Sequence, residues 1–275
     1  MPAAPRRPPA RRAPGRSDLG GRILFALPAL VFAAFIVAQG GIVFTVGLIL
    51  LGLVCLHELY GMFAFAAPSR LAGFAGLIGV LLAANYGGQF DMLLVLVATF
   101  PVAFALILLQ PRGGMPGISV TLLGVFWVGL ALAHAVLLRD LPHGGGAIVA
   151  VLLGTFVGDT GAYLGGRALG RRPLAPAISP NKTVEGLLIG MVCAVAVVWW
   201  AGLSQPWLGG THGALLGLAV AIAAPTGDLF ESYLKRDAGT KDTGRLFGPH
   251  GGALDRLDAV LFAAVAGYYV WNALS

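Results

Sequence analysis

A short charged segment near the C-terminus carries side chains whose types and spacing could do chemistry. At the helical spacing i, i+3, i+4 and i+7 it holds Asp228, Glu231, Ser232 and Lys235. Carboxylates and a cation on one face of an otherwise apolar helix favour a site that binds metal ions or phosphates. The alternative interpretation is a solvated helix end whose charges pair at the surface.

Two more carboxylates stand at the start of the last apolar segment. Asp255 and Asp258 are three residues apart, so they share a helix face. Acidic residues also stabilise a helix N-terminus, but this does not explain two of them together with Asp228 from another helix. Because Mg²⁺ is usually held by one or two carboxylates plus substrate phosphates, the set predicts metal-assisted chemistry on a phosphate-bearing substrate.

The loop between these segments combines charge with glycine. It contains Lys241-Asp242-Thr243-Gly244 and then Gly248-Pro249-His250-Gly251-Gly252. Glycine lets backbone amides approach a ligand closely, as phosphate-binding loops require. No Gly-Lys-Ser/Thr follows a strand, so this is not a Walker loop. His250 could carry a proton, contact a phosphate or form a turn.

A second polar stretch covers residues 159–185. Asp159 lies among glycines near the end of one apolar segment, and Ser179-Pro180-Asn181-Lys182-Thr183 leads into the next. We expect the glycines to let neighbouring helices pack closely around Asp159. Pro180 and the polar residues beside it predict a turn before the next helix.

The composition indicates lipid as the solvent. Of the 275 residues, 57% are hydrophobic and 11% charged, whereas a soluble domain is about half apolar and a quarter charged. The net charge of +6 suits an anionic membrane surface or a phosphate-bearing substrate. Cys55 and Cys193 each lie alone in apolar runs and are expected to be small buried hydrophobes.

Apolar runs of spanning length follow one another from Arg22 onward. The predicted spans are 22–39, 41–58, 70–86, 91–110, 117–138, 145–165, 184–203, 209–227 and 257–274. The first two are joined so tightly that their separation is open. We divide the chain into a disordered basic cytoplasmic tail (1–21), N-terminal transmembrane helices (22–140) and a C-terminal transmembrane catalytic region (141–275).

The basic residues predict the orientation. With nine spans and the N-terminus inside, only Arg139 of the 18 Lys and Arg residues lies outside. The predicted fold is therefore an all-α integral membrane protein of about nine transmembrane helices with a cytoplasmic-side active site. We expect a multi-pass protein of the cell inner (plasma) membrane whose N-terminus is cytoplasmic.

The charged segments resemble the phosphatidate cytidylyltransferases, or CDP-diacylglycerol synthases. Their signature is Ser-x-x-Lys-Arg, a Lys-Asp after four residues, then His-Gly-Gly and Asp-Arg-x-Asp. The matching residues are Ser232, Lys235, Arg236, Lys241, Asp242, His250, Gly251, Gly252, Asp255, Arg256 and Asp258. Upstream, Asp159-x-x-Ala162-Tyr163 and Ser179-Pro180-x-Lys182-Thr183-x-Glu185-Gly186 also look like the family.

The resemblance implies transfer of a cytidylyl group from CTP to phosphatidate, giving CDP-diacylglycerol and pyrophosphate in phospholipid biosynthesis. It implies a magnesium-dependent site and leaves open a potassium ion beside the magnesium. Asp228 and Asp255 would bind the metal, and the catalytic residues would be Asp228, Asp255, Lys235 and Asp258. The substrate-binding candidates are Asp159, Ser179, Asn181, Lys182, Ser232, Arg236, Lys241, Asp242, His250, Gly251, Gly252 and Arg256.

Two other functions stay open. A CTP-dependent lipid kinase would transfer the γ-phosphoryl group to an alcohol and release CDP. A transporter is less favoured, because transporters place charges near the bilayer midplane and often have inverted repeats. The expected partners are CTP, phosphatidate and the bilayer. Nucleic acid is not expected, because long apolar runs interrupt the basic residues, and a homodimer is one assembly such a protein could form.

Overall fold

Helices dominate the part of the chain that the structure describes. A computed structural model describes residues 17–110, 114–244 and 251–275. The helices are α1 (Ser17–Gln39), α2 (Gly41–Met62), α3 (Arg70–Tyr86), α4 (Gln89–Leu108), α5 (Met115–Gly124), α6 (Leu130–Asp140), α7 (Gly144–Leu169), α8 (Val184–Ser204), α9 (Gly210–Asp237) and α10 (Leu254–Leu274). A π-helical turn, η2 (Val125–Gly129), joins α5 to α6, and a 3₁₀ turn, η1 (Ala64–Ala66), follows α2.

Every predicted apolar segment is a helix. Seven helices of the described residues, counting Met115–Asp140 as one, are long and apolar enough to cross a membrane. The two shorter apolar helices are Pro28–Gln39 and Arg70–Tyr86. Many large apolar side chains, such as Phe100 and Trp200, are exposed on helix surfaces, as expected where lipid replaces water. The protein is thus a multi-pass helical membrane protein, and nine crossings remain a prediction.

Two helix ends differ most from the predicted ends, and one boundary that the sequence left open is now assigned. Helix α1 begins at Ser17, inside the stretch predicted as a disordered tail, and residues 1–16 lie outside the described part. Gly40, with φ of 68°, separates α1 from α2, so the first two segments are distinct helices. Helix α9 continues ten residues beyond the predicted end at 227, to Asp237.

One small sheet departs from the all-α prediction. Strand β1 (Pro173–Ala175) pairs antiparallel with β2 (Ser179–Thr183) in a hairpin between α7 and α8, where the sequence predicted only a turn. A hairpin this short is marginal alone. Outside contacts stabilise it: Arg236 Nε donates to Ile178 O (3.0 Å), and the Glu185 carboxylate accepts the backbone N–H groups of Arg171 and Arg172.

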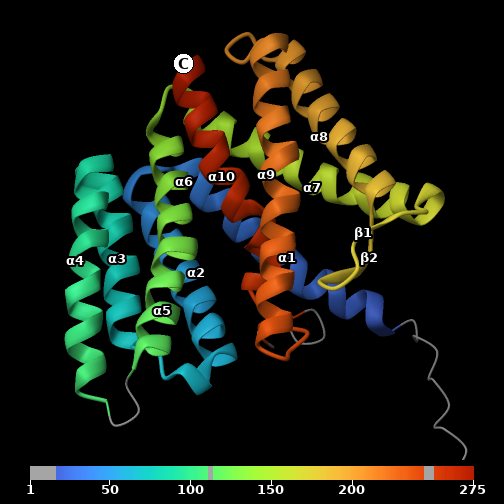
Figure 1. The fold of residues 1–275 in the computed structure, drawn as a ribbon. Coiled ribbons are helices and arrows are strands. Elements are labelled where there is room, and N and C mark those ends of the chain that lie inside the picture. The colour runs from blue at the N-terminus through green and yellow to red at the C-terminus, as the bar shows by residue number, and fades with distance from the viewer. Residues whose placement is uncertain (1–16, 111–113, 245–250) are drawn as a thin grey trace, which may run out of the picture. The chain divides into compact units, whose positions relative to one another are not determined.

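Small residues bring the C-terminal helices into close contact. Residues 1–35 form one unit and residues 36–275 another, and all packing described here lies within the second. Helices α7, α8, α9 and α10 pack as successive neighbours (Figure 1). A Cβ on Gly190 of α8 would lie 2.7 Å from Gly158 O of α7, so the two backbones are nearly in contact. The expected packing role of the glycines around Asp159 is confirmed.

Candidate active site

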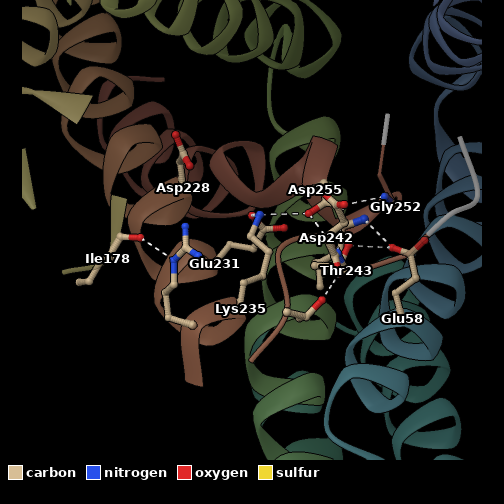
Figure 2. Close-up of polar contacts among 12 residues, drawn as sticks. Glu58, Ile178, Asp228, Glu231, Lys235, Asp242, Thr243, Gly252 and Asp255 are labelled. Atoms are coloured by element: carbon tan, nitrogen blue, oxygen red, sulfur yellow. Dashed lines mark hydrogen bonds and ion pairs between the residues drawn. The ribbon is translucent and has the colours of Figure 1, made fainter. Parts of the chain in front are cut away.

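The extension of α9 places its charged face at the centre of the site. Glu231 is 1% exposed, and its Oε2 accepts a hydrogen bond from Lys235 Nζ at 2.5 Å. The same ammonium group contacts Asp255 Oδ1 of α10 at 3.0 Å (Figure 2). A buried carboxylate is costly unless it is paired, so Lys235 makes this arrangement stable. The alternative of a solvated helix end is wrong for this face.

Asp255 is fixed by backbone amides as well as by Lys235. Its Oδ2 accepts the N–H groups of Gly252 (2.6 Å) and Thr243 (3.1 Å). The carboxylate lies in the first turn of α10, where the partial positive charge of the helix N-terminus favours an anion. Asp255 thus connects α9, α10 and the loop between them.

Asp258 lies where α9 and α10 cross. A Cβ on Gly227 would lie 2.4 Å from Asp258 O, so the two helix backbones meet there. The Asp258 carboxyl group interacts electrostatically with Asp228, Glu231 and Lys235. The predicted meeting of acidic residues from two helices is confirmed.

A cavity of about 450 Å³ opens beside these residues, between α7, α8, α9 and the hairpin. Its polar lining includes Asp159, Ser179, Asn181, Lys182 and Asp228. Lys182 forms an ion pair with Asp228. The apolar part of the wall includes Gly154, Leu187, Ala194, Val220 and Ala221. One end can therefore take a charged headgroup, while the rest suits an apolar chain.

The remaining predicted residues that the structure describes are not part of the cavity lining and lie on α9, on the loop after it and on the first turn of α10. Ser232 is half-buried on α9, and Arg236 of the same helix holds the hairpin. Lys241 and Asp242 are exposed on the loop, and Arg256 is exposed on the first turn of α10. His250 lies outside the described residues, so its three interpretations stay open.

The structure explains why glycine occupies the two glycine positions of the His-Gly-Gly motif. Gly251 has a φ of 82°, which favours glycine, and its missing Cβ leaves room for the Asp255 carboxylate. The Gly252 N–H donates to Asp255. In this structure the motif binds a carboxylate of the chain itself, and phosphate contact by these glycines stays a prediction.

Comparison with known proteins decides the family. A sequence model described as "Cytidylyltransferase family" matches residues 20–274. The chain belongs to the cytidylyltransferase family. A relative named phosphatidate cytidylyltransferase, from Brucella suis biovar 1, is 37% identical over 263 residues that cover 94% of both chains.

Two further relatives carry the same name. One from Mycobacterium bovis is 33% identical over 214 residues, covering 76% of this chain and 66% of the relative. One from Helicobacter pylori (strain J99) is 44% identical over 120 residues, covering 44% of this chain and 45% of the relative. The expected membership of the cytidylyltransferase family is confirmed, and it extends well beyond the motif region.

Three residues of this cytidylyltransferase site were not predicted as site residues. Glu231 was placed on the charged face without a role, Thr243 was treated only as part of the loop, and Glu58 was not considered. Glu58 of α2 accepts hydrogen bonds from Ala253 N (3.0 Å) and Leu254 N (2.9 Å). A carboxylate near the end of an otherwise apolar membrane helix was the available signal.

The surroundings of α9 fit a bound cation. Four carboxyl groups, from Asp159, Asp228, Glu231 and Asp258, gather near two lysines. Glu231 Oε1 is buried and has no hydrogen-bond partner among the described residues. Within that same part of the chain, no three His, Cys, Asp or Glu side chains form a ready-made metal cluster. One or two of the four carboxyl groups would be enough for Mg²⁺, which takes few protein ligands and completes its shell with phosphates and water.

Proposed function

We propose that the protein transfers the cytidylyl group of CTP to phosphatidate, forming CDP-diacylglycerol and pyrophosphate. The observation that carries this proposal is the similarity, over 94% of both chains, to a relative named phosphatidate cytidylyltransferase. The geometry supports it, because Lys182, Asp159 and Asp228 line a cavity that also has an apolar wall, and the Lys235–Asp255 ion pair lies further along α9. Such a cavity suits a lipid that carries a phosphate headgroup.

The reaction exchanges one phosphorus–oxygen bond for another. A phosphate oxygen of phosphatidate forms a bond to the α-phosphorus of CTP. The bond from that phosphorus to the oxygen bridging to the β-phosphate breaks, and its electron pair leaves with pyrophosphate. A phosphomonoester whose second pKa is about 6 is mostly dianionic at pH 7. The nucleophile therefore needs no general base from the protein.

Repulsion between the two polyanionic substrates is the difficulty that the site must overcome. Lys182, Lys235, Arg236 and Lys241 are the proposed phosphate-binding residues. Two of them, Lys182 and Lys235, are paired with carboxylates, which keeps the cations oriented in the site. Electrostatic stabilisation by preorganised charges is the main source of catalysis in phosphoryl transfer.

Metal ions are part of the proposal. Asp228 and Asp255 are the proposed ligands of Mg²⁺. The neighbouring carboxyl groups of Glu231 and Asp258 could supply negative charge to a second cation, K⁺. When bound, Mg²⁺ would neutralise phosphate charge and stabilise the departing pyrophosphate. Asp228 and Asp255 would hold the ion, and Lys182 and Lys235, which contact these two carboxylates, would bind the phosphates beside it.

The membrane arrangement completes the proposal. We place the protein in the inner membrane with its N-terminus and active site on the cytoplasmic side, supported by the distribution of basic residues. The acyl chains of phosphatidate would remain among the apolar side chains of the cavity wall and the surrounding lipid. A homodimer is one assembly that this proposal allows.

The first prediction concerns Asp255. Purified protein supplied with phosphatidate, MgCl₂ and CTP labelled on the α-phosphate should move label into the lipid phase and release pyrophosphate. Asp255→Asn removes the charge that Lys235 and two backbone amides hold, so we expect turnover to fall by about 1,000-fold or more. Asp140→Asn, on an exposed acid at the end of α6, is the matched control and should retain activity.

The outcomes separate the alternatives. An active Asp255→Asn protein would remove this residue from the mechanism. Release of CDP without label in the lipid, when a lipid alcohol is supplied, would favour the kinase. Failure of EDTA to stop transfer would contradict the magnesium proposal.

A further inference from the structure

Glu58 is a buried carboxylate from the N-terminal half of the chain that reaches the active-site loop. It lies near the end of α2 and is 7% exposed. Its Oε1 accepts the Ala253 N–H and its Oε2 accepts the Leu254 N–H, at 3.0 Å and 2.9 Å. The Thr243 hydroxyl also approaches Oε2, at 3.4 Å. A buried carboxylate is expensive to keep without such donors, so these contacts account for its presence in an apolar helix.

The Ala253 and Leu254 N–H groups stand at the start of α10, where no carbonyl of the same helix can accept them. The first turn of any helix leaves N–H groups without intrahelical partners, and a residue at the N-cap usually satisfies some of them. The N-cap residue here is Ala253, which has no side chain that could do so. Glu58 supplies the missing acceptor from a different helix, and its negative charge also suits the positive end of α10.

The same loop residues bind both Glu58 and Asp255. Thr243 donates its backbone N–H to Asp255 and its hydroxyl to Glu58. Gly252 donates to Asp255, and the next residue, Ala253, donates to Glu58. Figure 2 shows Glu58 on one side of Thr243 and Gly252, with Asp255 and Lys235 on the other. Movement of the loop at Glu58 would therefore displace the partners of Asp255.

Two glycines leave the space that this contact requires. A Cβ on Gly252 would lie 2.2 Å from Glu58 Oε2, and a Cβ on Gly244 would lie 2.4 Å from Oε1. Both distances are far below van der Waals contact. The last glycine of the His-Gly-Gly motif is thus explained by a residue that lies outside every motif of the C-terminal region.

We propose that Glu58 is a positioning residue of the active site. It holds Thr243 and the start of α10 so that Asp255 faces Lys235 and the reacting phosphates. The proposal rests on the proposed function, since it assigns Glu58 to the same site. Glu58 does not itself touch the substrates.

The test compares Glu58→Gln with Glu58→Asp and with Thr45→Val. Glutamine keeps the shape but replaces one accepting oxygen by an NH₂ group that faces an N–H donor. We expect Glu58→Gln to lower kcat about 10- to 100-fold, with KM for CTP changed by no more than about threefold. Glu58→Asp restores both oxygens at a shorter reach, so it should recover part of the loss.

Thr45→Val is the control for stability alone. Thr45 is fully buried at the other end of α2, where it bonds Asn85 and Gly41. This variant should lower the unfolding temperature without changing kcat of the folded protein. A Glu58→Gln enzyme with wild-type kcat, or with a loss no larger than its loss of folded protein, would overturn the proposal.

Hydrogen exchange of the full-length protein in detergent gives a second readout that does not depend on activity. In Glu58→Gln, the amides of Thr243, Ala253 and Leu254 should exchange faster, while those of α7 and α8 stay unchanged. Unchanged exchange at the start of α10 would contradict the anchoring. If the unsubstituted protein formed no CDP-lipid, the proposed function would fail, and the exchange measurement would still decide whether Glu58 anchors the loop.

Discussion

Lys235 is the residue at which the charges of the site are balanced. Its side chain is 17% exposed, and its ammonium group contacts the carboxylates of Glu231 and Asp255. Removing one partner of a buried ion pair leaves an uncompensated charge, which costs more than the pair contributed. The lysine therefore has two tasks: it stabilises the folded site, and it supplies positive charge for a phosphate.

A substitution pair can separate these two tasks. Lys235→Met leaves Glu231 buried without its cation, so we expect a loss of about 3 kcal/mol in the free energy of unfolding together with loss of activity. The double variant Glu231→Gln/Lys235→Met also removes the buried Glu231 charge, while Asp255 keeps its backbone N–H donors, so it should recover part of the stability but none of the activity. Thermal unfolding in detergent and CDP-lipid formation measure the two effects. A Lys235→Met protein as stable as the unsubstituted one would show that the ion pairs contribute nothing to the fold.

Local spacing explains which site residues could be predicted. Asp228, Lys235, Asp255 and Asp258 stand in short polar stretches of an apolar chain, so their types and helical spacing identified them. Glu58 is 185 residues from Thr243 along the chain, and no local pattern joins the two. The motif glycines suggested a phosphate-binding loop. The structure adds that a side chain at Gly252 would collide with the Glu58 carboxylate, to which the sequence assigned no role.

At the scale of elements, the crossing of α9 and α10 determines the geometry of the acidic residues. Gly227 is the residue directly before Asp228, and it lies against the backbone of Asp258. Only a residue without a side chain allows the two helices to meet at this point. The crossing therefore sets the separation of the carboxylates that we assign to the metal.

Gly227→Ala tests this crossing. Its methyl group would lie 2.4 Å from Asp258 O, a backbone atom that cannot rotate away, so the helices must separate. We expect a loss of about 1–3 kcal/mol in stability and a fall in CDP-lipid formation larger than the fall in folded protein. Gly61→Ala in α2 is the matched control, because a Cβ there meets nothing within 4 Å.

The control should be neutral or slightly stabilising, since alanine is the better helix former. Equal effects of Gly227→Ala and Gly61→Ala on activity would show that the close crossing is not needed.

The helices were predictable as elements, whereas the hairpin was not. Long apolar runs bounded by polar residues identify helices such as α3, whose ends at Arg70 and Tyr86 agree with the predicted ones. Strands β1 and β2 are three and five residues long and show no alternation of buried and exposed positions. Arg236 from α9 donates a hydrogen bond to the turn between them, a contact that the local sequence does not reveal.

At the scale of the whole molecule, the Glu58 contact constrains the number of membrane crossings. Glu58 lies near the end of α2, and its donors lie at the start of α10. Both must be on the same side of the membrane, so the chain between them crosses an even number of times. Among the described residues, six apolar helical segments lie between them: α3, α4, Met115–Asp140, α7, α8 and α9. Five of these are long enough to span, so we infer that the short helix α3 also crosses.

Crossing by α3 is physically feasible. At 1.5 Å per residue its 17 residues extend about 25 Å, slightly less than the roughly 30 Å hydrocarbon core. A shortfall of this size is met by local thinning of the bilayer at modest cost. The contact between Glu58 and α10 and the predicted number of nine spans therefore both require that α3 crosses the membrane. One experiment on α3 tests both.

Cysteine labelling in intact cells tests whether α3 crosses. Phe65→Cys and Tyr86→Cys place thiols at the two ends of α3, on side chains that are both 76% exposed. A membrane-impermeant maleimide should label Tyr86→Cys in spheroplasts but label Phe65→Cys only after permeabilisation. The unsubstituted protein corrects for Cys55, which is buried, and for Cys193, which is partly exposed. Equal labelling of both variants from one side would mean that α3 does not cross, and the contact between Glu58 and α10 could not then form in the membrane.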